Sequence, residues 1–274
     1  MGNNKHEHSD EVLSGCSGGI GSLMRAKGLD SNSEWTRWGR EDPLWAVFTE
    51  PDRECGGRLP WTDEEFYATG QPDWEDFIQR WHQYGLDLES CLEVGCGTGR
   101  ITCPLSASFR RVFAVDISPE MIQRARDAST RGNVEFGLTD GIKLPYQDRF
   151  VKAIFSTHVL QHLDSSRVVL EYFREFFRVL DSGGTIMIHV PLYAWPKVGR
   201  IAWFLENAVN TALAVSQCLA WTKRRFGARM MRMTAVHIQY LHSELTVLGF
   251  RDIEFRTFPI SRDGTLHSFV LARK

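Results

Sequence analysis

The stretch Leu92-Glu-Val-Gly-Cys-Gly-Thr-Gly-Arg100 joins a short apolar run, an acid and three alternating glycines. The apolar run is typical of a buried strand, and Gly95, Gly97 and Gly99 then predict a turn that leads into a helix. Because glycine has no Cβ and readily adopts positive φ, such a turn can bring bare backbone against a ligand. For an isolated glycine triplet, the alternative is an ordinary glycine-rich turn.

A second apolar run, Val112-Phe-Ala-Val-Asp116, ends in an acid about twenty residues after the first, where nucleotide-binding α/β folds place the carboxylate that takes the ribose hydroxyls. The order E-x-G-x-G-x-G differs from the dinucleotide fingerprint G-x-G-x-x-G, whose third glycine comes one place later. Together the two runs resemble the cofactor motifs of the class I S-adenosylmethionine (SAM) dependent methyltransferases, of the bacterial small-molecule type.

Strands and helices alternate along the middle of the chain. Strands are expected at about 90–94, 112–116, 133–136, 151–156 and 185–191, with helices at about 99–109, from Ser118 onward and at 165–180. Ser118-Pro119-Glu120 carries helix-start signals, and Gly183-Gly184 predicts a left-handed helix end. Such alternation predicts a parallel sheet that binds its ligand at the carboxyl ends of the strands.

The family resemblance extends this prediction to the whole fold. It implies an α/β, seven-stranded Rossmann-like sheet in the order 3-2-1-4-5-7-6, with strand seven antiparallel. The last helix is expected at 242–250, and a closing hairpin at 253–258 and 266–271.

By this resemblance, SAM is the cofactor and its binding residues can be named. Glu93 would hold the amino group, Asp116 the ribose and Ile117 the adenine face. Asp140 would accept a hydrogen bond from the adenine amine. The remaining expected cofactor contacts are Gly95, Cys96, Gly97 and Gly99 of the loop, the Gly141 amide, His158, and Tyr67, which could equally be a packing residue.

His158 and His162 follow the strand expected at 151–156. Their spacing can put two metal ligands on one helical face. No zinc-protease glutamate lies between them and no third ligand stands out, so the sequence predicts no metal site. The resemblance places His158 beside the SAM amino group and His162 at the closure of the pocket. His162 is a candidate general base, and a packed helix residue is the equal alternative.

The chain is expected to have five parts: a disordered polar tail (1–33), a helical cap (34–89), the SAM-binding core (90–191), a helical insertion (192–239) and the end of the core (240–274). The stretch Trp38-Gly-Arg-Glu-Asp-Pro-Leu-Trp-Ala-Val47 resembles a cap that covers the cofactor in the family. In the insertion, an amphipathic helix at 201–221 precedes a basic run at 223–232. A solvated face is the ordinary explanation of that run, and contact with an anionic acceptor or a membrane surface is the alternative.

Composition limits the partners. A formal net charge of −2 over 274 residues offers no electrostatic case for nucleic acid. The six cysteines show no metal spacing, and the first residues do not form a secretion signal, so a cytoplasmic protein is expected. The predicted function is methyl transfer from SAM to a small or amphipathic metabolite, with an oxygen or nitrogen acceptor. The alternatives are a different SAM-based transfer on the same fold, or a SAM-binding regulatory protein without turnover.

Overall fold

The computed structural model describes residues 30–194, 231, 233–260 and 264–274. The chain divides into two units, Met1–Asp30 and Ser31–Lys274, and the second holds all the elements described below. Its first helix, α2 (Ser31–Glu41), begins inside the tail predicted for residues 1–33, so that prediction is wrong for residues 31–33.

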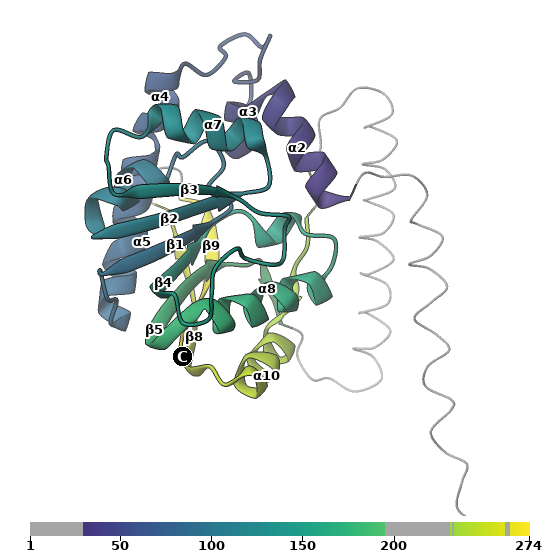
Figure 1. Cartoon of the computed structure of the whole chain (residues 1–274). Helices are drawn as coiled ribbons and strands as arrows, with labels where there is room; N and C mark the ends of the chain where they lie inside the picture. Colours follow the sequence, from purple (N-terminus) through teal and green to yellow (C-terminus); the bar gives the residue numbers. More distant parts are fainter. Residues whose placement is uncertain (1–29, 195–230, 232, 261–263) are drawn as a thin grey trace, which may run out of the picture. The chain divides into compact units, whose positions relative to one another are not determined.

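A seven-stranded sheet in the order β3-β2-β1-β4-β5-β9-β8 forms the centre of this unit (Figure 1). Its strands are β1 (Ser90–Val94), β2 (Arg111–Asp116), β3 (Val134–Leu138), β4 (Val151–Ser156), β5 (Leu180–His189), β8 (Arg251–Pro259) and β9 (Leu266–Arg273). The first five pair in parallel, and β9 runs antiparallel to both of its neighbours. Since β8 and β9 are the sixth and seventh strands of this sheet, the predicted order 3-2-1-4-5-7-6 is confirmed.

Both faces of the central strands are buried, because successive side chains of a strand point to opposite sides. On β4, Ile154 belongs to one apolar cluster, whereas Ala153 and Phe155 belong to another. On β5, Ile186 and Met187 divide between the clusters in the same way. The continuous apolar runs of the sequence therefore correspond to strands that are buried on both faces of the sheet.

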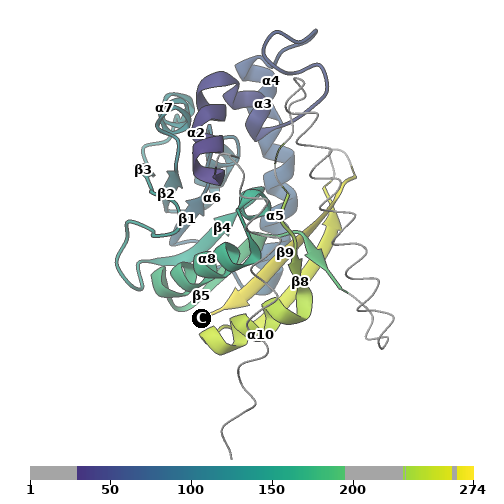
Figure 2. The same ribbon diagram turned by 90° about the vertical axis from the view of Figure 1, so that its right-hand side faces the viewer.

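Helices supply the two outer layers (Figure 2). The apolar cluster that contains Ile154 is completed by α8 (Ser166–Val179) and α10 (Ile238–Leu248). The cluster that contains Phe155 is completed by α5 (Gly70–Tyr84) and α6 (Thr102–Ser108). The helical spacing of Trp74, Phe77 and Trp81 is confirmed in α5. These rings pack on Phe155 of β4 (centroid distances 5.4–6.0 Å), so α5 is a layer of the core rather than part of the predicted cap.

The helix α7 (Pro119–Ala128) begins as the sequence predicts. The Ser118 hydroxyl accepts a hydrogen bond from the Met121 amide at 3.3 Å, and Pro119 occupies the first turn. An N-cap of this kind fixes the place where the chain turns from β2 into the helix.

Three predicted helix limits are wrong. The helix after β1 begins at Thr102 rather than Gly99, because the chain first makes a turn. The helix α8 ends at Val179, before the glycines, since buried Leu180 is already extended and begins β5. The last helix begins at Ile238, inside the segment predicted as the insertion.

The cap consists of α2, α3 (Pro43–Val47) and α4 (Asp63–Ala68), and α2 packs against α7. Past β5, the short strands β6 (Leu192–Tyr193) and β7 (Val236–His237) pair in parallel. The amphipathic helix predicted at 201–221 and the basic run at 223–232 lie outside the described residues. Within the described part of the chain, no helix is both long and apolar enough to cross a membrane.

The packing of α5 generates a stability prediction. Trp81 is fully buried, and its indole Nε1 donates to Thr185 Oγ1 at 3.0 Å. Trp81→Ala should lower the free energy of unfolding by about 3–5 kcal/mol in urea titrations. Tyr240→Ala is the control, because Tyr240 is exposed and should change stability by less than about 0.5 kcal/mol. Equal effects of the two substitutions would contradict the packing described.

Candidate active site

The glycine loop after β1 requires the backbone that glycine allows. Gly95, Gly97 and Gly99 have φ values of 75°, 53° and 87°. A Cβ on Gly95 would lie 2.1 Å from Val159 Cγ2, and one on Gly97 would lie 2.7 Å from Val47 Cγ2. The loop therefore packs closely against the segment after β4 on one side and against the cap on the other, whether or not a ligand is bound.

Asp116 fixes this loop from the end of β2. Its Oδ2 accepts from the Gly97 amide and its Oδ1 from the Ser118 amide, both at 2.9 Å. Burial raises the pKa of this carboxyl, while the amide hydrogen bonds act in the opposite direction. Each carboxylate oxygen has a second lone pair, so Asp116 can also accept the two hydroxyls of a ribose.

Glu93 at the end of β1 is a buried acid with one unused oxygen. Its side chain is 3% exposed, and among the described residues Oε2 has no hydrogen-bond partner. Burial raises the pKa of Glu93 to about 8, although the nearby Thr102 hydroxyl and the charge of Arg100 act to lower it. Arg100 itself pairs with Asp73 at 2.7 Å. An ammonium group brought to Glu93 would satisfy this oxygen.

These groups face one cavity of ≈ 430 Å³, a size usual for a small-molecule site. Eight of the residues predicted from sequence line it: Glu93, Gly95, Cys96, Gly97, Asp116, Ile117, His158 and His162. They come from the carboxyl ends of β1, β2 and β4, as expected for a parallel sheet.

Four predicted residues do not line the cavity. The Tyr67 hydroxyl donates to the Thr98 carbonyl at 2.9 Å, so it supports the loop from outside. The Asp140 side chain is exposed, and the neighbouring Thr139 lines the cavity in its place. Gly141 adjoins Asn32, and Gly99 packs against Ala125 of α7.

Sequence reasoning missed much of the lining. Trp45 and Val47 line the cavity and belong to the stretch that was expected to cover the cofactor. The missed residues are mostly apolar and include Trp35, Phe48, Tyr172, Met231, Met233, Thr265 and His267. The aromatic density of residues 35–48 was a signal for the cap residues. Nothing local marks Thr265 or His267, because only the pairing of β9 with β5 brings them here.

The two histidines after β4, His158 and His162, lie in different surroundings. His162 is buried in the short helix η1 (Leu160–His162), where its ring lies 5.0 Å from the Trp35 ring. Its Nε2 lies 2.9 Å from the Gln161 amide nitrogen, which can only donate, so Nε2 accepts. His158 instead lies beside His189, with ring centroids 4.8 Å apart.

Comparison with known proteins identifies the fold. Residues 92–188 match the family described as a methyltransferase domain. Among solved structures, magnesium protoporphyrin IX methyltransferase from Synechocystis, with bound SAH, has a TM-score of 0.57 at 17% identity, over 89% of this chain and 100% of the other. The sheet is therefore that of a class I SAM-dependent methyltransferase.

Curated relatives match the central segment. Demethylmenaquinone methyltransferase of Tropheryma whipplei is 33% identical over 101 residues, which are 36% of this chain and 41% of the relative. Malonyl-[acyl-carrier protein] O-methyltransferase of Hamiltonella defensa is 35% identical over 96 residues, 35% of each chain. This chain thus spans about two fifths or less of the length of these relatives. The shared segment is that of SAM-dependent methyltransferases, which makes SAM the cofactor of the domain, and the orphaned oxygen of Glu93 fits its ammonium group.

The buried acid gives a pH-dependent prediction. Because the pKa of Glu93 is raised from 4.5 to about 8, its contribution to stability is full below pH 4.5 and is lost as the pH rises through 8. In thermal unfolding without ligand, the wild type should therefore lose more stability between pH 5 and pH 8.5 than Glu93→Gln does.

The same substitution should weaken binding of S-adenosylhomocysteine by about 10- to 100-fold, or about 1.5–3 kcal/mol. Glu64→Gln, at an exposed acid of α4, should change neither property. If the thermal stabilities of the wild type and of Glu93→Gln change in parallel with pH, the claim that Glu93 is a buried carboxyl without a compensating charge is wrong.

Proposed function

We propose that this protein transfers the methyl group of SAM to an oxygen or nitrogen of a small or amphipathic molecule. The observation that carries the proposal is the cavity. In it, the buried carboxyl of Glu93, with one oxygen that no described residue pairs, and the loop-bound carboxylate of Asp116 stand at the ends of adjacent strands. The match of residues 92–188 to a methyltransferase domain supports it independently.

The polar end of the cavity suits the cofactor. Glu93 would take the ammonium group, Asp116 the ribose hydroxyls, and the half-buried Ile117 the adenine face. The amides of the glycine loop lie between the two acids. These contacts bind and orient the cofactor at the carboxyl edge of the sheet.

The apolar part of the cavity suits the acceptor. Trp35, Trp45 and Phe48 of the cap contribute rings to the lining, and Met231 and Met233 contribute flexible side chains. Such a wall favours a flat or lipid-like molecule over a highly charged one. Two of the relatives are named demethylmenaquinone methyltransferase and malonyl-[acyl-carrier protein] O-methyltransferase, and a small-molecule acceptor for this chain agrees with these names.

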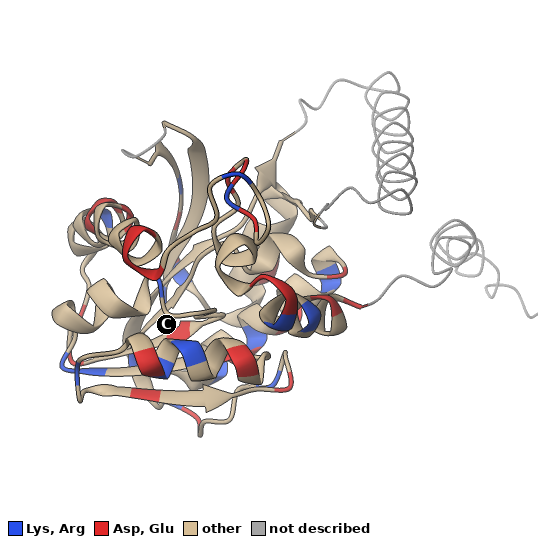
Figure 3. Ribbon diagram, turned by 90° about the horizontal axis from the view of Figure 1, so that it is seen from above, with Lys and Arg blue, Asp and Glu red and all other residues tan. Residues whose placement is uncertain are grey.

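Nucleic acid is not the expected acceptor. Lysine, arginine and the acids are interspersed over the described helices, as Figure 3 shows. This agrees with the net charge of −2 for the whole chain. The basic run that motivates the membrane-surface hypothesis lies outside the described residues, so that hypothesis and a cytoplasmic location stay predictions.

The protein's task in the reaction is mainly alignment. Bound SAM supplies a methyl group that its sulfonium already activates. The cavity walls would hold the acceptor atom in line with that methyl and exclude water, which can be worth roughly 7–11 kcal/mol. The acceptor lone pair forms the new bond to carbon, and the electrons of the broken S–C bond stay on sulfur. His162 is the candidate base for the proton of a hydroxyl or ammonium acceptor, and its Nε2 lone pair has to leave the Gln161 amide before it can take that proton.

Isotope labelling tests the reaction. Purified protein is incubated with a metabolite extract and SAM that is labelled in the methyl group, and in parallel with SAM labelled in the aminocarboxypropyl group. We expect methyl label in a low-mass product. The control Gly97→Val should make no product, because its side chain would enter the loop at φ 53° and meet Val47.

The other outcomes identify the rivals. Label only from the aminocarboxypropyl group would replace methylation by the alternative transfer. Tight binding of S-adenosylhomocysteine without any labelled product across extracts would favour a regulatory protein.

The role of His162 has its own test. If it accepts the proton of the acceptor, His162→Gln should lower turnover about 10²- to 10⁴-fold and remove a step in the pH–rate profile, with cofactor affinity retained. If it only packs against Trp35, thermal stability should fall and the pH profile should keep its shape. Trp35→Phe, which preserves a ring at the contact, separates loss of packing from loss of the base.

A further inference from the structure

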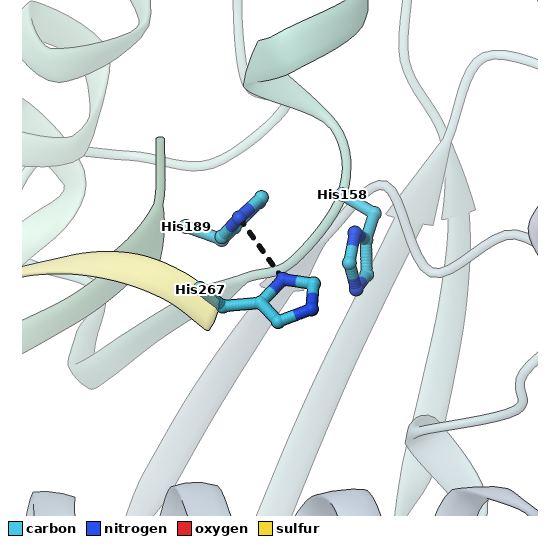
Figure 4. Close-up of side chains that lie close together, drawn as sticks. All are labelled: His158, His189 and His267. Carbon is cyan, nitrogen blue, oxygen red and sulfur yellow. Dashed lines mark hydrogen bonds between the residues drawn. The ribbon is translucent and has the colours of Figure 1, made fainter. Parts of the chain in front are cut away.

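Three histidines that are distant in the sequence meet at one side of the cavity. His158 follows β4, His189 ends β5 and His267 lies on β9, and Figure 4 shows the three rings around a common centre. Their ring centroids are 4.8, 4.9 and 5.1 Å apart. One nitrogen from each ring lies within 4.8 Å of the other two.

We propose that His158, His189 and His267 bind a divalent transition-metal ion of the Zn²⁺ type, with an open coordination position toward the cavity. Three imidazoles and one open position are the ligand set of many catalytic zinc sites. Imidazole nitrogen also favours Zn²⁺, Cu²⁺, Fe²⁺ and Ni²⁺ over Mg²⁺ or Ca²⁺.

The spacing of two ligands already fits such an ion. His189 Nε2 and His267 Nδ1 are 3.3 Å apart. Two nitrogens that are each about 2.0–2.1 Å from a tetrahedral ion lie about 3.3 Å from one another. The other nitrogen of His267, Nε2, lies 2.8 Å from Thr265 Oγ1. If His267 donates this hydrogen bond, its Nδ1 carries the lone pair that a metal requires.

The protonation state fits as well. His189 is 4% exposed, and burial together with the charges of His267 and His162 lowers its pKa to about 3. Burial and the neighbouring His189 also lower the pKa of His158 well below its ordinary value. Neutral imidazole is the form that binds metals.

The backbone at His158 is a further sign of a constrained site. Its φ is 59°, in the left-handed region that residues other than glycine seldom adopt. Such a conformation persists where the surroundings dictate it, and it clusters at ligand-binding positions. Here it turns the ring toward His189 and His267.

The open position faces the proposed acceptor. His158 and His267 both line the cavity, together with Thr157 and Thr265. An oxygen or nitrogen of the acceptor could occupy the fourth position, and this part of the inference rests on the proposed function. Metal binding itself does not depend on methyl transfer.

Metal titration of the full chain tests the site. After treatment with a chelator, the protein is titrated with Co²⁺ and, separately, with Zn²⁺ by calorimetry. We expect one ion per chain and the visible absorption of four-coordinate Co²⁺. His267→Gln should weaken binding by about 100-fold or more, since even loss of an outer-shell partner can cost 10- to 100-fold.

Two controls separate this site from other imidazoles. His82→Gln replaces an exposed histidine of α5 and should bind as the wild type does. The double variant His6→Asn/His8→Asn removes the pair in the N-terminal segment and should also retain the ion. If His267→Gln binds as tightly as the wild type, or if no ion binds at all, the inference is wrong.

A last measurement addresses the open position and keeps the two proposals apart. Azide added to the Co²⁺ protein should shift its absorption if a coordination position is exchangeable, whereas an unchanged spectrum would contradict an open position. Affinity for S-adenosylhomocysteine is measured on the same samples. If the protein binds the ion but not S-adenosylhomocysteine, the proposed function alone is refuted. If it binds S-adenosylhomocysteine but no ion, the metal site alone is refuted.

Discussion

The carboxylate of Asp116 joins the two turns on which the site depends. It accepts one hydrogen bond from an amide of the glycine loop after β1 and one from the Ser118 amide at the start of α7 after β2. The loop can follow this path because its glycines tolerate positive φ, and the amides of Gly95 and Cys96 are held by the Val115 carbonyl at 2.8 and 3.0 Å. One short side chain therefore fixes the distance between the two strand ends that form the polar part of the cavity.

The cap completes the site from the other side. Val47 lies against the position where Gly97 would carry a Cβ, and α2 packs on α7. Arg40 of α2 pairs with Glu120 of α7 at 2.7 Å, although this pair is exposed and contributes little to stability. The buried contacts of Trp38 and Trp45 with Met121 matter more, because they place the cap over the cofactor end of the sheet.

Local patterns in the sequence predicted the glycine loop and the acids at the ends of β1 and β2, and the family resemblance that these motifs carry implied the sheet order. The sequence did not reveal that Asp140 is exposed and outside the cavity lining or that the Tyr67 hydroxyl donates to the Thr98 carbonyl, since the place of a side chain depends on packing between elements. The histidine cluster was also out of reach. His189 and His267 are 78 positions apart, and they meet only through the antiparallel pairing of β5 with β9.

The central claim is that the loop after β1 and the two buried acids form a site for SAM rather than for a dinucleotide. Isothermal titration of the purified chain with S-adenosylhomocysteine and with NAD tests it most directly. The account predicts one S-adenosylhomocysteine per chain and no measurable heat with NAD. Binding of NAD that is tighter than binding of S-adenosylhomocysteine would contradict it.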